Sequence, residues 1–273
     1  MDKAFVDTTI LVDVLLKTGE QHESALASLQ AFQGTEAPAY AIREFKSGAL
    51  SYFRYAHNAV LQYGLAGTLE KLSALVRTPQ RNRPATALTA LAQSLNELDL
   101  PSEFASTYGE AAGESVRQDR LVVSLKVAIF RAWRQRRTVT DRITNELSCF
   151  DEDPPQVEPE GHVSFREQCC DLPCGLQEIL SSYHADLGVL SETIDALPDS
   201  AERGRNWKAI KKLRKQRQLT TSDCRGLGDV VFALLAPDDA YVLTTNVKDH
   251  LPLADALGKQ VCSPTEVLSR GTD

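Results

Sequence analysis

The sequence contains no long run of apolar residues and only six cysteines in 273 positions. A helix that crosses a bilayer needs about 18 or more consecutive apolar residues, and no segment approaches that length. The first ten residues, MDKAFVDTTI, also lack the basic segment and long apolar stretch of a secretory signal. Small secreted domains carry a dense disulfide framework, whereas these cysteines are sparse and unevenly spread. We therefore expect a cytoplasmic protein with reduced thiols and no association with a membrane.

A strong imbalance of charge is absent as well. Hydrophobic residues make up 42% of the chain and charged residues 25%, which are ordinary values for a folded globular protein. The length allows two ordinary domains or one domain with a large insertion. The net charge of −7 argues against a protein that coats polyanions over its whole surface, so any affinity for nucleic acid has to come from a local patch.

The first 50 residues predict the order strand, helix, helix, strand, helix. Short apolar runs indicate the strands, and apolar residues three or four positions apart indicate the helices. The predicted elements are a strand at Lys3–Val6, helices at Ile10–Lys17 and Glu23–Phe32, a strand at Thr35–Ala41, and a long helix at Ile42–Tyr63 that begins near Arg43 and Glu44.

Strand patterns almost disappear between residues 51 and 218, where helical spacing dominates. The predicted helices are Ala66–Val76, Ala85–Leu98, Glu103–Asn145, Gly175–Leu197 and Ala201–Gln218. Within this region Cys149–Leu172 contains DEDPPQVEPEG, whose prolines exclude a regular element and predict a surface loop.

Alternation of helices and strands returns after residue 220. The predicted elements are a helix at Gly228–Ala236, a strand at Ala240–Thr244, a helix at Leu251–Leu257 and a strand at Gln260–Cys262. Alternating elements of this kind predict a parallel sheet with helices on its faces. We therefore expect an α/β fold, a doubly wound parallel sheet built from both termini (residues 1–50 and 219–273) and interrupted by a large all-helical insertion (residues 51–218).

Acidic residues follow a strand or open a helix at three places far apart in the sequence. Asp7 follows the first strand, Glu44 opens the helix after the second, and Asp229 opens the helix before the third. Asn246 and Asp249 lie in the turn directly after that third strand. Because functional groups gather at the carboxyl ends of parallel strands, we expect these side chains to lie close together and to bind Mg²⁺ or Mn²⁺. The alternative is that Asp7 and Asp229 are only helix caps.

These acidic positions lie in three motifs. They are FVDTTILVDVLL (residues 5–16), AIREFKSGAL (residues 41–50) and GDVVFALLAPDDAYVLTTNVKDH (residues 228–250). In this order they resemble the motifs of PIN-domain ribonucleases, in which a first strand ends in Asp-Thr and a later strand ends in Thr, any residue, then Asp or Asn. The resemblance covers about two fifths of the chain.

The resemblance implies a fold and an activity. It makes Asp7, Glu44, Asp229 and Asp249 catalytic metal ligands, with Asn246 completing the metal site. Thr8 and Thr244 would orient these ligands. The implied reaction is metal-dependent hydrolysis of phosphodiester bonds in single-stranded RNA by an endoribonuclease, with Mg²⁺ or Mn²⁺ as cofactor.

The family pattern has a further functional implication, and the sequence departs from the pattern in three ways. A toxin-like or defence-associated nuclease is compatible with the motifs, and by analogy it implies an inhibitory or recruiting protein partner. Asn246 stands where the family often has Asp, and it holds a cation less strongly than a carboxylate. Thr9 replaces the more common Asn or Ser, and the region between the motifs has no counterpart in the family.

A basic stretch near residue 210 is the predicted contact for RNA. Its residues are Arg203, Arg205, Lys208, Lys211, Lys212 and Lys215. Helical spacing places the lysines opposite a seam of Trp207, Ile210 and Leu213, so they could bind phosphates or simply form a solvated face. A second, weaker cluster contains Arg131, Arg134, Arg136 and Arg137.

Several other side chains have competing interpretations. Asp223 is a spare metal ligand or a helix cap. His250 could contact substrate, but it is predicted to be a turn residue. The cysteines Cys149, Cys169, Cys170 and Cys174 with His162 and His184 match no paired zinc-binding spacing, which favours ordinary thiols.

Two rival functions remain. The first is a PIN-like scaffold with little or no catalytic activity, whose helical insertion binds protein or nucleic acid; Asn246 favours it and Asp249 argues against it. The second is a phosphohydrolase acting on small phosphate esters. An aspartyl-phosphate mechanism would want a second Asp two residues after Asp7, where the chain has Thr9.

Overall fold

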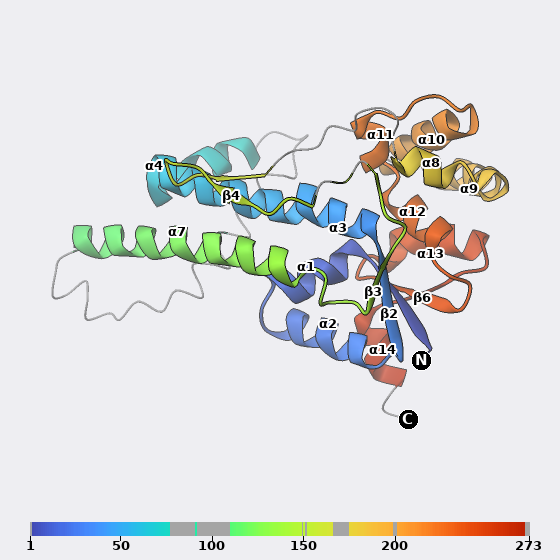
Figure 1. Ribbon diagram of the computed structural model, residues 1–273, viewed down its shortest axis with the longest axis horizontal. Helices are drawn as coiled ribbons and strands as arrows, with labels where there is room; N and C mark the ends of the chain where they lie inside the picture. Colours follow the sequence, from blue (N-terminus) through green and yellow to red (C-terminus); the bar gives the residue numbers. More distant parts are fainter. Residues whose placement is uncertain are drawn as a thin grey trace. The chain divides into compact units, whose positions relative to one another are not determined.

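A five-stranded sheet, in which all neighbouring strands run parallel, forms the centre of the α/β fold (Figure 1). The computed structural model describes residues 2–76, 91, 110–148, 150, 152–165, 175–198 and 201–270. The strand order is β3-β2-β1-β6-β7. The strands span Lys3–Val6 (β1), Gly34–Pro38 (β2), Arg142–Thr144 (β3), Ala240–Leu243 (β6) and Gln260–Cys262 (β7). A parallel sheet that joins the two ends of the chain was predicted, and this part of the prediction is confirmed.

The pairing of β1 with β6 lies at the middle of this sheet. Phe5, Val6, Val242 and Leu243 are all buried, as expected for strands covered on both faces. Val6 is the register partner of Leu243, so the residues that follow, Asp7 and Thr244, emerge side by side. The chain continues from β1 to β2 on one side and from β6 to β7 on the other, so the strand order reverses between β1 and β6. This is the position at which doubly wound sheets form a crevice.

Helices pack around the sheet in two groups. Helix α2 (Glu20–Gln30) contacts α1 (Thr8–Leu16) and α14 (Pro264–Arg270). Helix α13 (Val247–Ala256) contacts α12 (Gly228–Leu235) and α9 (His184–Ala196). Figure 1 shows α2 with α14 and α12 with α13 as separate groups beside the strands. Their apolar faces close the core, in which Phe5 meets Phe232 edge to face at 6.1 Å between ring centroids.

The chain divides into two compact units. The first contains Met1–Phe45, Arg136–Asp151 and Glu167–Asp273, and the second contains Lys46–Gln135 and Glu152–Arg166. Helices α8 (Gly175–Leu180), α10 (Ala201–Arg214) and α11 (Thr221–Arg225) therefore belong with the sheet. This division differs from the predicted insertion at residues 51–218, because residues 136–151 and much of the segment after 167 pack into the α/β unit.

The second unit is built on two long helices. Helix α4 (Ser51–Val76) packs along α7 (Glu110–Gln135), and the π-helix η1 (Lys46–Leu50) precedes α4. A hairpin of β4 (Gln156–Val157) and β5 (Val163–Ser164) packs against α4. Asn58 fixes it by donating from Nδ2 to the Val163 carbonyl and accepting from the Val163 amide, both at 2.9 Å. Within the described parts of the chain, no helix has the length and apolar content to cross a membrane.

Several predicted elements differ from the structure. The region expected to be all-helical contains β3, β4 and β5, and the predicted helix Glu103–Asn145 ends at Gln135. Strand β3 pairs with β2 because Asp141 Oδ2 accepts from the Thr35 amide at 2.7 Å, a contact between residues 106 positions apart. The second strand ends at Pro38, and α3 (Ala39–Phe45) begins at once. Residues 103–109, and Ala85–Leu98 apart from Leu91, lie outside the described residues.

A glycine kink in α4 yields a stability prediction. Gly64 has φ 71° and ψ 174°, a conformation open essentially only to glycine, and an added Cβ would lie 3.0 Å from Gln118 Oε1. We expect Gly64→Ala to lower the free energy of unfolding by about 1–3 kcal/mol. Gly188 in α9 is the control, because an added Cβ meets nothing within 4 Å. Gly188→Ala should raise stability by about 0.5–1 kcal/mol. Urea unfolding followed by circular dichroism measures both, and equal effects would contradict this account.

Candidate functional site

Asp7 directly follows β1, at the point where the strand order reverses between β1 and β6. Its side chain is 3% exposed, and its Oδ1 caps α1 by accepting from the Thr8 amide at 2.6 Å. Its Oδ2 accepts from the hydroxyls of Thr9 and Thr244, each at 2.7 Å. Capping therefore explains one oxygen only. The other oxygen is held by hydroxyl groups from both central strand ends, which keeps a buried carboxylate ionised in a fixed position.

Glu44 reaches the same region from α3. It lies in the second turn of that helix, not at its start as predicted, and its Oε2 accepts from the Thr8 hydroxyl at 2.6 Å. Its other oxygen faces the beginning of α12, where a Cβ on Gly228 would lie 3.3 Å from Oε1. A glycine at this position leaves room for the carboxylate. Thr8 thus connects Asp7, through its amide, to Glu44, through its hydroxyl.

His250 is the side chain that links Asp7 to Asp229. Its ring is 3% exposed, and Nε2 lies 3.6 Å from Asp7 Oδ2 and 3.3 Å from Asp229 Oδ1. Asp229 is the second residue of α12 and is partly buried. The prediction that His250 is a turn residue is wrong, because α13 begins at Val247 and carries the imidazole into the core.

Asp7, Glu44 and Asp229 together are called the acidic group. Its electrostatics reflect burial and crowded negative charge. Burial and then the charge of Asp7 raise the pKa of Glu44 to about 7, although the bond from Thr8 acts the other way. Burial also works against ionisation of Asp7 and His250, but their contact and the hydroxyl bonds outweigh it. The pKa of Asp7 is therefore lowered and that of His250 is raised. The imidazole relieves only part of the repulsion among Asp7, Glu44 and Asp229.

Asn246 and Asp249 do not join this group. Asn246 precedes α13, and its Nδ2 donates to Asp249 Oδ2 at 2.7 Å. The Asn246 backbone N–H donates to the Thr244 hydroxyl at 2.9 Å. The structure thus brings together Asp7, Glu44, Asp229, Thr8 and Thr244, and leaves Asn246 and Asp249 paired with each other beside them.

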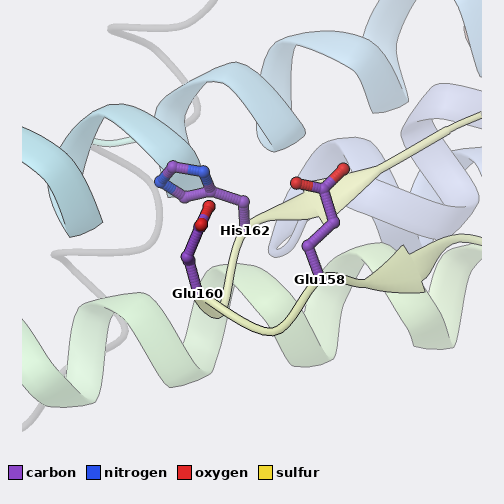
Figure 2. A group of neighbouring side chains, drawn as sticks. All are labelled: Glu158, Glu160 and His162. Atoms are coloured by element: carbon purple, nitrogen blue, oxygen red, sulfur yellow. The ribbon is translucent and has the colours of Figure 1, made fainter.

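A second cluster of ligand-type side chains lies on the β4–β5 hairpin. Among the described residues, the one set of three or more such groups whose ligand atoms all lie close together is Glu158, Glu160 and His162 (Figure 2). The hairpin turn itself gathers them, since Gly161 has φ +87° and the Glu158 amide donates to the His162 carbonyl at 2.9 Å. Both carboxylates are exposed and solvated. We assign this cluster no function, because the turn accounts for its geometry without a bound ion.

Helix α10 carries the predicted basic face and packs next to the start of α12. A Cβ on Gly226, two residues before Gly228, would lie 3.3 Å from the Cβ of Arg205. Ile210 and Leu213 are buried, which confirms the predicted seam. Arg205, Lys208, Lys211 and Lys215 are exposed, and Lys211 Nζ lies 3.2 Å from the centroid of the Trp207 ring.

Two other predicted members of this basic face, Lys212 and Arg203, are not among these exposed residues. Lys212 forms an ion pair with Asp223 Oδ2 at 2.5 Å, so its charge is largely matched within the protein. Asp223 is the capping-box residue of α11, as one of its two interpretations held. The side chain of Arg203 lies outside the described residues. In the second basic cluster Arg136 is buried, whereas Arg131, Arg134 and Arg137 are exposed.

The cysteines give no support to a zinc site. Cys149, Cys169, Cys170 and Cys174 lie outside the described residues. Cys224 and Cys262 are buried free thiols, and burial raises the pKa of Cys262 to about 12. A thiol with so high a pKa is a poor metal ligand, because the thiolate is the form that binds.

Sequence reasoning missed two contributors to the acidic group, Thr9 and His250. Thr9 accepts a bond from the Thr245 amide at 3.1 Å while it donates to Asp7. The DTT tripeptide could have identified it, since a hydroxyl two residues after a capping Asp can bond that side chain. For His250 the available signal was an apolar helical pattern that continues through residues 247–257.

The raised pKa of Glu44 predicts how stability depends on pH. Because the folded-state pKa (about 7) exceeds the ordinary value of 4.5, folding favours the protonated carboxyl. The free energy of unfolding should fall by up to about 3 kcal/mol as pH rises from about 4.5 to 7, and it should then stay low. In EDTA at pH 8 we expect Glu44→Gln to be more stable than wild type and to show a flatter profile. Urea unfolding across pH measures this.

The exposed Glu158 provides the control for that experiment. Glu158→Gln should change the free energy of unfolding by less than about 0.5 kcal/mol at any pH. Identical pH profiles for wild type and Glu44→Gln would show that the acidic group is not under electrostatic strain.

Comparison with known proteins finds no match for this chain. No protein-family model, curated protein or solved structure matches it. The interpretation of the acidic group therefore depends on the positions and contacts of its residues, together with the motif resemblance.

Proposed function

We propose that the protein is a metal-dependent endoribonuclease that hydrolyses phosphodiester bonds of single-stranded RNA at the acidic site formed by Asp7, Glu44 and Asp229. One observation carries the proposal. Asp7, Glu44 and Asp229, from three separate segments of the chain, are linked through Thr8 and His250 beside the strand-order reversal, where burial and then the charge of Asp7 raise the pKa of Glu44 to about 7. A fold has no structural need for such a grouping, whereas a cation site does.

The donor set fits a hard dication such as Mg²⁺ or Mn²⁺. Its members offer carboxylate oxygens, which are the ligands that these ions prefer. A bound dication would supply an acidified water and neutralise charge that develops on the phosphate oxygens. Asp249 and Asn246 bond each other, so neither is proposed as a direct metal ligand.

The neighbouring residues keep the carboxylates in position for this reaction. Thr8 fixes one oxygen of Asp7 and one of Glu44, while Thr9 and Thr244 fix the second oxygen of Asp7. Each hydroxyl donates, which favours the ionised form of the carboxylate that accepts the bond. Support of this kind orients ligands before substrate arrives.

Helix α10 is the proposed contact for the RNA backbone. Arg205, Lys208, Lys211 and Lys215 are exposed on a helix that packs against the turn leading into α12. Phosphate contacts by Lys and Arg give affinity without sequence preference. The ammonium group of Lys211 lies over the Trp207 ring.

A non-catalytic PIN-like scaffold is the second candidate, and two observations favour it. The imidazole of His250 lies between Asp7 and Asp229 and already supplies positive charge to the group. Asn246 and Asp249 form a closed pair instead of extending the ligand set. In this alternative, protein or nucleic acid would bind to the helical parts of the chain and no RNA would be cleaved.

Cleavage of labelled single-stranded RNA with Mn²⁺ or Mg²⁺ separates these functions. We expect wild type to cleave and Asp7→Asn with Asp229→Asn to lose about 10²-fold or more of the rate. Asp249→Asn should retain most activity, because its carboxylate bonds Asn246. Asp255→Asn, an exposed position on the same helix α13, is the control. Folded wild-type protein that does not cleave would favour the scaffold.

The basic helix makes a separate prediction about binding. In EDTA, the triple variant Lys208→Ala, Lys211→Ala, Lys215→Ala should bind single-stranded RNA more weakly than wild type. The slope of log affinity against log salt should become shallower by about 0.7 for each lost phosphate contact. Replacing the exposed Arg131, Arg134 and Arg137 with Ala removes equal charge elsewhere. If both triple variants lose affinity equally, α10 is not the RNA contact.

A further inference from the structure

The buried imidazole of His250 brings a nitrogen ligand into contact with the acidic site. Its 3% exposure excludes a role at the protein surface, and its Nε2 atom is the atom that faces both Asp7 and Asp229. The polar nitrogen atoms of a buried histidine need partners. This one points its nitrogen at two carboxylates that the proposed function uses as metal ligands.

The packing of α13 holds the ring in that orientation. Phe232 of α12 contacts it edge to face, with 5.5 Å between ring centroids and 72° between ring planes. Phe232 is itself wedged against Phe5 and Tyr40. Helix α13 also contacts β7 and α9, so it cannot move away without disturbing the core. The imidazole is therefore as firmly positioned as the carboxylates.

The two distances from His250 Nε2 to the carboxylates are each those of a pair of atoms that can share one ion. Ligand atoms about 2.1–2.2 Å from a metal, at angles of about 90–110°, lie about 3.0–3.6 Å apart. Nε2 lies 3.6 Å from Asp7 Oδ2 and 3.3 Å from Asp229 Oδ1. The pair Asp7 and Asp229 is wider, since the three residues do not form a fully closed group. An ion would have to draw the two carboxylates inward while Nε2 stayed in place.

We propose that His250 binds the metal through Nε2 and so makes the site prefer a first-row transition dication, such as Mn²⁺ or Co²⁺, to Mg²⁺. This inference rests on the proposed function, because it names the ion class and a further ligand of the same site. Mg²⁺ takes oxygen ligands in near-ideal octahedral geometry, whereas imidazole favours transition metals. A site of three carboxylates and one buried imidazole combines both ligand types.

The test measures metal binding and does not depend on RNA cleavage. Wild type is titrated with Mn²⁺ and with Mg²⁺ in competition at pH 8, and the bound Mn²⁺ is examined by pulsed electron paramagnetic resonance for coupling to ¹⁴N. We expect nitrogen coupling in wild type and its loss in His250→Gln. The preference for Mn²⁺ over Mg²⁺ should fall about tenfold or more in that variant. If His250→Gln folds poorly, His250→Asn provides a second variant. The ¹⁴N coupling of the wild-type protein tests the proposal without any variant.

His162→Gln is the matched control, because the hairpin cluster also combines a histidine with two carboxylates. It should retain the nitrogen coupling and the metal preference. Mn²⁺ binding that Asp7→Asn removes, but that shows no ¹⁴N coupling and an unchanged preference in His250→Gln, would overturn the role of His250 and leave the proposed function standing. Absence of any Mn²⁺ binding that depends on Asp7 would overturn both.

Discussion

The parallel pairing of β1 with β6 is the interaction on which the rest of the structure depends. It joins residues 3–6 to residues 240–243, so the two ends of the chain share one buried layer. The register partner of Val6 is Leu243, and Thr244 therefore donates to Asp7 directly. Without this pairing the chain would have no strand-order reversal, and Asp7 would not lie close enough to Asp229 for both to contact His250. Closing so long a loop costs entropy, which the buried apolar strands offset.

Hydroxyl groups then set the fine arrangement that the sheet only approximates. Thr8, Thr9 and Thr244 all donate to carboxylates, and Thr9 and Thr244 also accept from the amides of Thr245 and Asn246. Each hydroxyl therefore links a strand end to an acidic side chain. Replacing one of them would leave a buried oxygen without its donor, which costs more than the bond contributes. The site is supported by the same contacts that close the two central strand ends.

The sequence predicted the framework better than the details of the site. Buried runs such as AFV and AYVL, bounded by polar turns, indicate parallel strands from local pattern alone. Strand β3 could not be found this way, since three residues become a strand only through Thr35 and Asp141. Asp249 bonds Asn246 and not Asp7, Glu44 or Asp229 for a geometric reason. Adjacent residues on a helix point about 100° apart, so once α13 begins at Val247, His250 faces the acidic group and Asp249 cannot.

The charges of the acidic group explain how one arrangement can suit both a free protein and a bound cation. Near neutral pH a Glu44 carboxyl with a pKa of about 7 is partly protonated, and the raised pKa of His250 favours its imidazolium. These two protons reduce the repulsion that Asp7 and Asp229 would otherwise feel. A dication bound under the proposed function would release both and leave a similar net charge. Protons and a cation are thus alternative means of neutralising the same carboxylates, so the fold need not collapse or rearrange when one replaces the other.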